Sequence, residues 1–291
     1  MDSVTFDQLL KSPVTDLPSK TLVDAWYDGT KYMHDFSREV MLPLLKMLLV
    51  PSPQEVAVRD TYYKMSLLLR SVLLMNSLDH FQSVASLTRS VFELWLDLSI
   101  LAQDAGGDAV RSYNEFPEVE RYRVAEQLIR FATTSGQPLK MDISAQRAFH
   151  ADVQRSQRIA KIVKAGLKGK RKYPDHWTNR SVRQRAIDVG QEVMYVEAYP
   201  QLSWYVHAGA AGTAGITRDG FEHVFGFCHS LIQRIFIDAT SKCAKATKIS
   251  ALDYFDGWMQ SIRLKTGEIV VAEQIKMLEA KRQQVAKGGS P

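Results

Sequence analysis

Four polar side chains recur at four-residue spacing in an otherwise apolar stretch of the sequence: Tyr195, Tyr199, Ser203 and His207. Residues four apart lie on one face of a helix, so their polar tips should form one stripe, unless Pro200 breaks the helix between them. Tyr, Ser and His side chains can orient an anion or transfer a proton, and an unperturbed imidazole titrates near neutral pH. The stripe predicts a site in which His207 transfers the proton. The alternative is a buried hydrogen-bonding ladder between two helices.

A second polar set, Arg89, Glu93 and Asp97, also shares one helix face and adjoins a strongly apolar stripe. Arg89 and Glu93 are either a surface i,i+4 ion pair, worth roughly 0.2–0.5 kcal/mol, or part of a site. In a helix this apolar, buried charges persist only when they are paired. We expect Arg89 and Glu93 to lie within hydrogen-bonding distance of the stripe that ends at His207.

The third candidate is an anion-binding surface. Eleven basic residues and one acidic residue lie between Arg155 and Arg185, a net charge of +10 in a chain whose net charge is +5. Such a concentration predicts contact with nucleic acid or another polyanion, and the alternative is a solvated helix face. We expect Trp177 to be at least half buried and to anchor this segment. The predicted anion-binding residues are Lys168, Lys170, Arg171, Lys172, Arg180 and Arg183.

The sequence lacks the motifs of several enzyme classes: Gly-x-Gly-x-x-Gly, the Walker Gly-Lys-Ser/Thr, His-Glu-x-x-His and Cys-x-x-Cys. We therefore expect no cofactor and no metal site. Two cysteines favour a reducing compartment over a disulfide framework. Because we see neither a secretory signal nor an apolar run of bilayer-spanning length, we expect a cytoplasmic protein without a membrane partner.

Helical periodicity covers most of the chain, and strand signals are scarce. The sequence predicts an all-α fold, a single multi-helix bundle over residues 1–286 with a loose tail at 287–291. A loop is expected at 169–179, and Pro117 is expected to open a helix. The predicted helices cover residues 24–49, 53–75, 79–102, 108–114, 117–133, 144–168, 181–207, 219–247, 251–264 and 266–286.

Three short segments together resemble a known family: Arg89-Ser-Val-Phe-Glu93, Trp177-x-x-Arg180-Ser181, and the stripe from Tyr195 to His207 followed by Ala-Gly. Over about residues 60–245 the chain resembles a bacterial all-helical domain of unknown function, similar in outline to HEPN-like and abortive-infection proteins. The resemblance implies a HEPN-like core with additional N-terminal and C-terminal helices. It also implies that Arg89, Glu93, Ser203 and His207 surround one site.

Arg218 and His223 provide an alternative site, because they match the Arg-x4-6-His signature of HEPN endoribonucleases. Chance alone accounts for a match of this kind in a chain with seven histidines. Nothing in the sequence decides between this junction and His207.

These observations lead us to expect an RNA-binding helical protein that acts as a metal-independent endoribonuclease of prokaryotic defence or toxin type. Its partner would be RNA or another polyanion. A homodimer is one expected oligomeric form of the protein. The alternative is a non-catalytic helical module that binds a protein or nucleotide partner, so both an enzyme and a binding protein fit the sequence. The candidate catalytic residues are His207, Ser203, Arg89, Glu93 and Tyr199.

Overall fold

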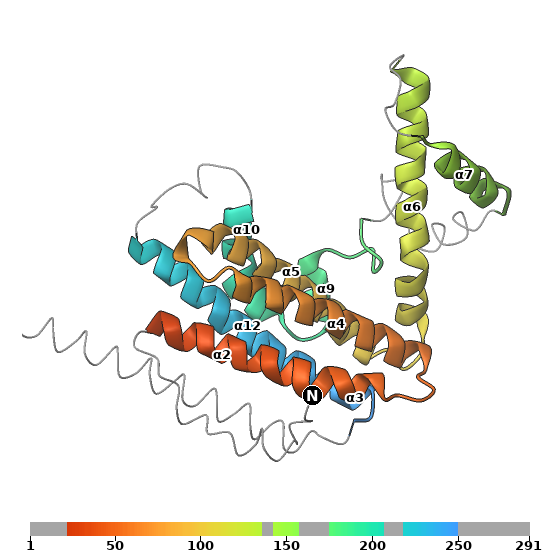
Figure 1. Ribbon diagram of the computed structural model, residues 1–291. Coiled ribbons are helices and arrows are strands. Elements are labelled where there is room, and N and C mark those ends of the chain that lie inside the picture. Colours follow the sequence, from red (N-terminus) through yellow and green to blue (C-terminus); the bar gives the residue numbers. More distant parts are fainter. Residues whose placement is uncertain (1–21, 136–141, 157–174, 207–217, 250–291) are drawn as a thin grey trace, which may run out of the picture. The chain divides into compact units, whose positions relative to one another are not determined.

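The computed structural model describes residues 22–135, 142–156, 175–206 and 218–249, and the regular structure among these residues is entirely helical (Figure 1). The expected all-α fold is confirmed. The chain forms two compact units: one combines the part up to Ala102 with the part from Val189 onward, and the other runs from Gln103 to Asp188. The single domain expected over 1–286 stays a prediction.

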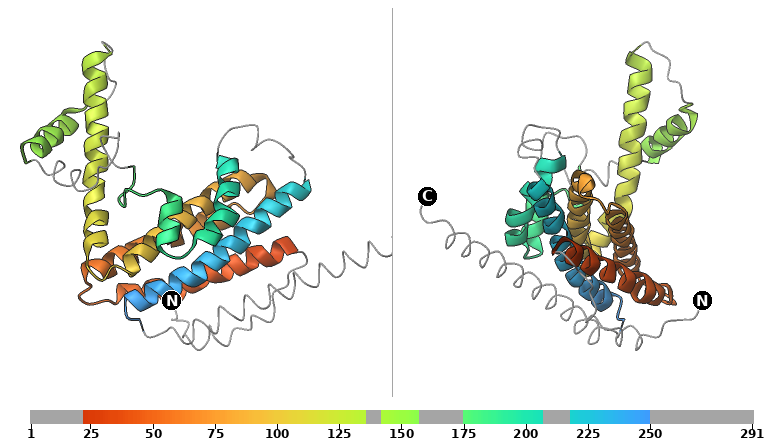
Figure 2. Two further views of the ribbon diagram at one scale, coloured as in Figure 1. Left: turned by 180° about the vertical axis from the view of Figure 1, so that it is seen from behind. Right: turned by 60° about the vertical axis from the view of Figure 1, so that its left-hand side comes forward.

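The first unit is built around α5 (Phe81–Ala102), which packs against α4, α10 and α12 (Figure 2). Helix α12 also packs against α2 and α4. A π-helical turn at Ser37–Met41 joins α2 to α3, and a 3-10 turn at Leu78–His80 precedes α5. The other helices are α2 (Leu22–Phe36), α3 (Leu42–Lys46), α4 (Pro53–Leu74), α10 (Glu192–Val206) and α12 (Arg218–Ala246).

The start of α4 is fixed by a capping box. The Ser52 hydroxyl accepts a hydrogen bond from the Glu55 amide, and the Ser52 amide donates to the Glu55 carboxylate at 2.6 Å. Pro53 occupies the first helical position, where a missing N–H leaves no intrahelical bond unmade. The hydrogen bond from the Ser52 amide also holds the pKa of Glu55 below its usual value. These local features place α4 where the sequence predicted it.

Helix α5 forms the centre of the core because 12 of its 22 residues are buried. The buried hydroxyls of Thr88 and Ser99 donate to carbonyls one turn earlier in the same helix, and the Ser99 hydroxyl also accepts from Lys242 of α12 at 3.0 Å. The Trp95 indole donates to the Asp238 carboxylate of α12 at 2.6 Å, and Lys242 pairs with that carboxylate. Apolar packing and this polar contact together hold α5 against α12.

Two glycines allow α2 and α12 to approach closely. A Cβ atom added to Gly226 would lie 1.8 Å from Cζ3 of Trp26, and one added to Gly29 would lie 2.7 Å from Nε2 of Gln233. The Gln233 amide donates to the Trp26 carbonyl at 2.8 Å. A larger side chain at Gly226 would therefore collide with the Trp26 ring, whereas one at Gly29 would displace the Gln233 side-chain amide.

The second unit contains α6 (Asp108–Thr134), α7 (Ser144–Ser156) and α9 (Val182–Asp188). Helices α6 and α7 pack through a small apolar cluster. The Tyr122 ring stacks on His150, with ring centroids 4.6 Å apart. The cluster consists of Val119, Tyr122 and Val153, with Phe116 and Phe149 at its edge.

Two predicted helix boundaries are wrong. Pro117 does not open a helix but lies inside α6, which runs unbroken from 108 to 134. The contacts of Phe116 and Val119 with α7 offset the one hydrogen bond that the proline removes.

The helix predicted at 181–207 is divided, because Gly190 adopts a left-handed φ of 71° between α9 and α10. The helices expected at 251–264 and 266–286 and the tail lie outside the described residues, as does 144–168 beyond residue 156.

We expect the buried His229 to make the stability of the first unit depend on pH. Its Nδ1 lies 2.8 Å from the Thr30 hydroxyl, its Nε2 has no hydrogen-bond partner in the described part of the chain, and burial lowers its pKa to about 3. In the unfolded chain the same imidazole titrates near pH 6.5. The unfolded state therefore binds the proton first as the pH falls.

The contribution of His229 should be complete above about pH 6.5 and decline by up to roughly 1.4 kcal/mol per pH unit below it. Urea unfolding between pH 7.5 and 5 measures this slope. His229→Gln should flatten it, whereas His223→Gln, at an exposed position of α12, should leave it unchanged. Identical slopes for His229→Gln and the wild type would contradict the assignment.

Candidate functional site

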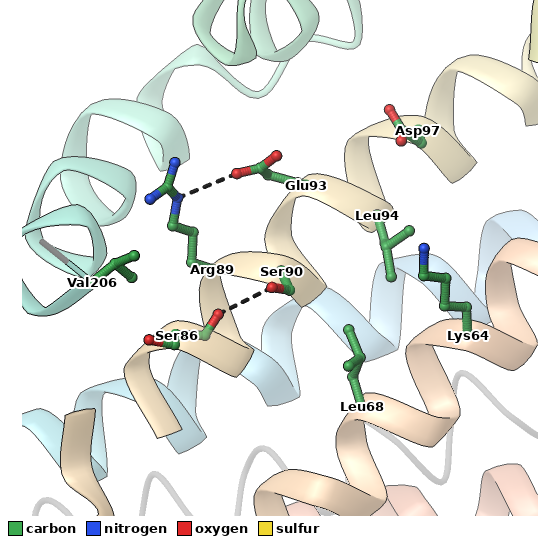
Figure 3. Close-up of a pocket in the computed structure, with 9 residues that line it drawn as sticks. All are labelled: Lys64, Leu68, Ser86, Arg89, Ser90, Glu93, Leu94, Asp97 and Val206. Atoms are coloured by element: carbon green, nitrogen blue, oxygen red, sulfur yellow. Dashed lines mark hydrogen bonds and ion pairs between the residues drawn. The ribbon is translucent and has the colours of Figure 1, made fainter. Parts of the chain in front are cut away.

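A pocket of about 490 Å³ lies in the first unit, between α4, α5 and the end of α10 (Figure 3). Its floor is the polar strip of α5, whose residues recur at three- and four-residue spacing. Both cationic and carboxylate side chains face it. The lining residues are Ser86, Arg89, Ser90, Glu93, Leu94 and Asp97 from α5, Lys64 and Leu68 from α4, and Val206 from α10.

Arg89, Glu93 and Tyr199 form a closed hydrogen-bonded group at one side of this pocket. The Arg89 Nε donates to Glu93 Oε1 at 3.2 Å and to Tyr199 Oη at 3.0 Å, and the Tyr199 hydroxyl donates to the same Glu93 oxygen at 2.7 Å. The guanidinium carbon also lies 5.0 Å from the centre of the Tyr199 ring. The expected contact of Arg89 and Glu93 with the α10 stripe is confirmed.

Tyr199 acts as a donor in this group. Burial, and then its hydrogen bond to the Glu93 carboxylate, raise the pKa of Tyr199 to about 12. The phenol is therefore protonated at neutral pH, and its proton is directed at Glu93. Tyr199 is thus suited to positioning Glu93 and Arg89 and unsuited to accepting a proton.

The geometry leaves Arg89 able to bind an anion. Its two contacts within the group both use Nε, and in the described part of the chain its two terminal amino groups have no hydrogen-bond partner. The Arg89 side chain is 25% exposed, so solvent or a ligand reaches it. A guanidinium with both terminal amino groups available can bind a phosphate or carboxylate through two parallel hydrogen bonds.

Comparison with known proteins gives a family and no function. The model of a family of unknown function (DUF5677) matches residues 55–222. The chain belongs to this family. No curated protein and no solved structure matches it. The expected membership in a domain of unknown function is thereby confirmed, and the match includes every residue that lines the pocket.

The other residues of the α10 stripe contribute less to the pocket of this DUF5677 protein. Ser203 donates its hydroxyl to the Tyr199 carbonyl at 3.0 Å, within its own helix, and Tyr195 stacks on the Tyr199 ring at 5.1 Å. Neither lines the pocket. His207 lies outside the described residues, and His223, from the alternative site, is exposed on α12. The Arg218 side chain also lies outside the described part.

In the described part of the basic segment, two of the arginines make contacts within the protein. Arg180 forms an ion pair with Asp188, and Arg183 is exposed on α9. The Arg185 side chain is only 2% exposed, and its Nη1 lies 3.1 Å from His176 Nε2. Because an arginine only donates, Arg185 is the donor of this bond and His176 Nε2 is the acceptor. The predicted anion-binding residues Lys168, Lys170, Arg171 and Lys172 lie outside the described residues.

Trp177 is largely buried, as expected for an anchor of the basic loop. Its ring meets the Tyr113 ring of α6 edge-on, with centroids 5.5 Å apart. The indole N–H is buried without a hydrogen-bond partner in the described part of the chain. The anchor is therefore aromatic packing within the second unit.

Sequence reasoning missed Lys64, Ser86 and Ser90. Ser86 and Ser90 flank Arg89 on the polar face of α5, so helical spacing alone identifies them as its neighbours. Lys64 is one of three cationic residues of α4, with Arg59 and Arg70, and only the packing of α4 against α5 brings it to the pocket. In the described ranges, no group of three or more His, Cys, Asp or Glu side chains is placed to hold a metal ion, and no helix is long and apolar enough to cross a membrane.

We expect Tyr199 and Glu93 to be energetically coupled. Tyr199→Phe and Glu93→Gln should each lower the free energy of unfolding by about 1–2 kcal/mol, because each removes part of one partly buried hydrogen-bonded group. The double variant should lose about 1 kcal/mol less than the sum of the two single variants. Urea denaturation of the four proteins measures the coupling, and additive losses would show that the contact has no energetic weight.

Proposed function

We propose that this protein binds RNA and that its pocket holds a backbone phosphate against Arg89. The observation that carries the proposal is the orientation of Arg89: its Nε is occupied by Glu93 and Tyr199, while its terminal amino groups have no hydrogen-bond partner among the described residues. Charged hydrogen bonds of this kind position the strands of nucleic acids but carry no sequence information.

Two further features support a polyanionic ligand. Lys64 brings a second cation to the pocket from α4, and the Ser86 hydroxyl adds a neutral donor beside Arg89. The Ser90 hydroxyl donates to the Ser86 carbonyl at 3.1 Å. In the second unit, the segment from Arg155 to Arg185 carries a net charge of +10. A field of that sign raises the local concentration of a polyanion and speeds its association.

Arg89→Gln should weaken binding of an RNA oligonucleotide by about 10- to 100-fold, because a charge-assisted contact is worth about 1.5–3 kcal/mol. Arg70→Gln is the matched control: it removes the same charge from an exposed position of α4 that does not line the pocket. Fluorescence anisotropy at several salt concentrations measures both. Equal effects of the two variants would mean that only overall charge matters.

The salt dependence also separates the proposal from its alternative, a non-catalytic module that binds a protein or nucleotide partner. RNA affinity should fall steeply with salt, because phosphate contacts release counterions. Neutral replacement of Lys168, Lys170, Arg171 and Lys172 together should reduce that slope. RNA binding that is absent, or that does not respond to salt, would favour the alternative.

We further propose that bound RNA is cleaved, with His207 as the proton-transfer group. Val206 lines the pocket, and His207 is the next residue in the chain. A base at the 2′-hydroxyl and a cation at the phosphate are the minimum for metal-independent cleavage, and Arg89 would supply the cation. The HEPN-like relationship and a defence or toxin role are supported by the motif resemblance alone.

In the presence of EDTA, His207→Ala should abolish cleavage of a labelled RNA while preserving binding and the melting temperature. His223→Ala should have no effect if the site is at the pocket. Loss of cleavage with His223→Ala alone would transfer the site to the Arg218–His223 junction. Cleavage that survives both changes, or that is absent from the wild type, would leave RNA binding as the function.

A further inference from the structure

Helix α10 carries a row of exposed apolar side chains on a face separate from the pocket. The exposed fraction is 71% for Val193, 59% for Val196 and 54% for Trp204, and Pro200 is also exposed. At 3.6 residues per turn these four residues, the apolar face of α10, lie within an arc of about 80°. The middle of that arc is about 100° from Tyr199, which faces α5. Single exposed apolar residues are ordinary, but a contiguous row of them is typical of an interaction site.

The order of residues on the apolar face is nearly symmetric about Ala198. Val193 and Trp204 are five and six residues from Ala198, and Val196 and Pro200 are each two residues from it. A two-fold axis near Ala198 would bring a second copy of α10 against the first in antiparallel orientation. Trp204 would then pack against the partner's Val193, and Pro200 against the partner's Val196. The face is therefore complementary to itself.

A polar edge beside the apolar face fits the same axis. Glu197 and Gln201 are both exposed there, and the midpoint between them is one residue from Ala198. The axis keeps the polar edges of the two helices on one side, so Glu197 of each copy would lie near the partner's Gln201. Gln201 Nε2 donates one hydrogen to the Glu197 carbonyl at 2.9 Å, and an amide nitrogen carries a second one that a carboxylate can accept.

We propose that the apolar face of α10 is the contact between two copies of this chain in an antiparallel dimer. Its composition supports this occupant, because protein interfaces are enriched in Trp and their cores are depleted in charged residues. The proposal gives the expected homodimer a specific contact and does not depend on RNA binding. A face about 16 Å long is short for a standard interface of roughly 800 Å² per partner. The dimer should therefore be weak.

Sedimentation velocity of the full chain tests the proposal. The average mass should rise from that of a monomer toward that of a dimer between about 1 and 200 μM, as expected for a small interface. Val196→Glu should weaken the dimer by about 10-fold or more, because it places a carboxylate in an apolar contact of both copies. Leu67→Glu is the matched control, at a position of α4 that is 64% exposed, and it should leave association unchanged.

A charge exchange tests the antiparallel register. Gln201→Glu should weaken the dimer by about 3- to 10-fold, because it places like charges opposite each other at two symmetric positions. Adding Glu197→Lys to that variant should restore the wild-type association, because each ammonium group then faces a carboxylate. Melting temperatures measured at a concentration where the chain is monomeric show whether the variants fold.

Each outcome supports or overturns the proposal. A wild-type chain that stays monomeric at the highest concentration overturns it. If Val196→Glu then lowers the melting temperature of the monomer and Leu67→Glu does not, another segment of the same chain covers the face. An unchanged melting temperature leaves the face for a different protein. A dimer that Val196→Glu does not weaken forms through another surface, and failure of Glu197→Lys to restore association overturns the antiparallel register.

Discussion

The burial of α5 is the constraint on which the rest of the first unit depends. More than half of its residues are buried, and complete burial of one large apolar side chain contributes about 1.5–3 kcal/mol. Helices α4, α10 and α12 cover most of its surface. The strip with Ser86, Arg89, Glu93 and Asp97 carries the charged side chains of α5, and the pocket lies over it. The site is thus located where core formation leaves α5 uncovered.

The Arg89–Glu93 pair shows how a weak interaction gains importance from its surroundings. A partly exposed i,i+4 pair by itself contributes only about 0.3–0.5 kcal/mol. Tyr199 changes its geometry, because the phenol donates to Glu93 and accepts from Arg89. With three groups fixed by one another, the guanidinium has one orientation and loses less entropy on binding a ligand. The main effect of this group is to orient the Arg89 guanidinium, and its contribution to stability is secondary.

The sequence predicted α4, α5 and α12 to within about two residues because local signals coincide there, such as the Ser52 cap and the apolar stripe of α5. It also predicted that Arg89 and Glu93 meet the α10 stripe. The helix start predicted at Pro117 was wrong because packing allows a proline inside α6, and the unbroken helix predicted at 181–207 was wrong because Gly190 adopts a left-handed conformation. Lys64 was missed because its place depends on the packing of α4 against α5.

The basic segment and the pocket differ in the distance over which their charges act. The segment from Arg155 to Arg185 has a large net charge, but Arg180 is paired with Asp188 and Arg185 is buried, so its formal charge overstates the cations that a ligand can contact. The pocket sets Arg89 and Lys64 against Glu93 and Asp97, and these charges cancel beyond about one Debye length, roughly 8–10 Å. Under the proposed function, long-range attraction of RNA would therefore come from the segment. Discrimination between ligands would come from contacts inside the pocket, where each polar group requires a complementary partner.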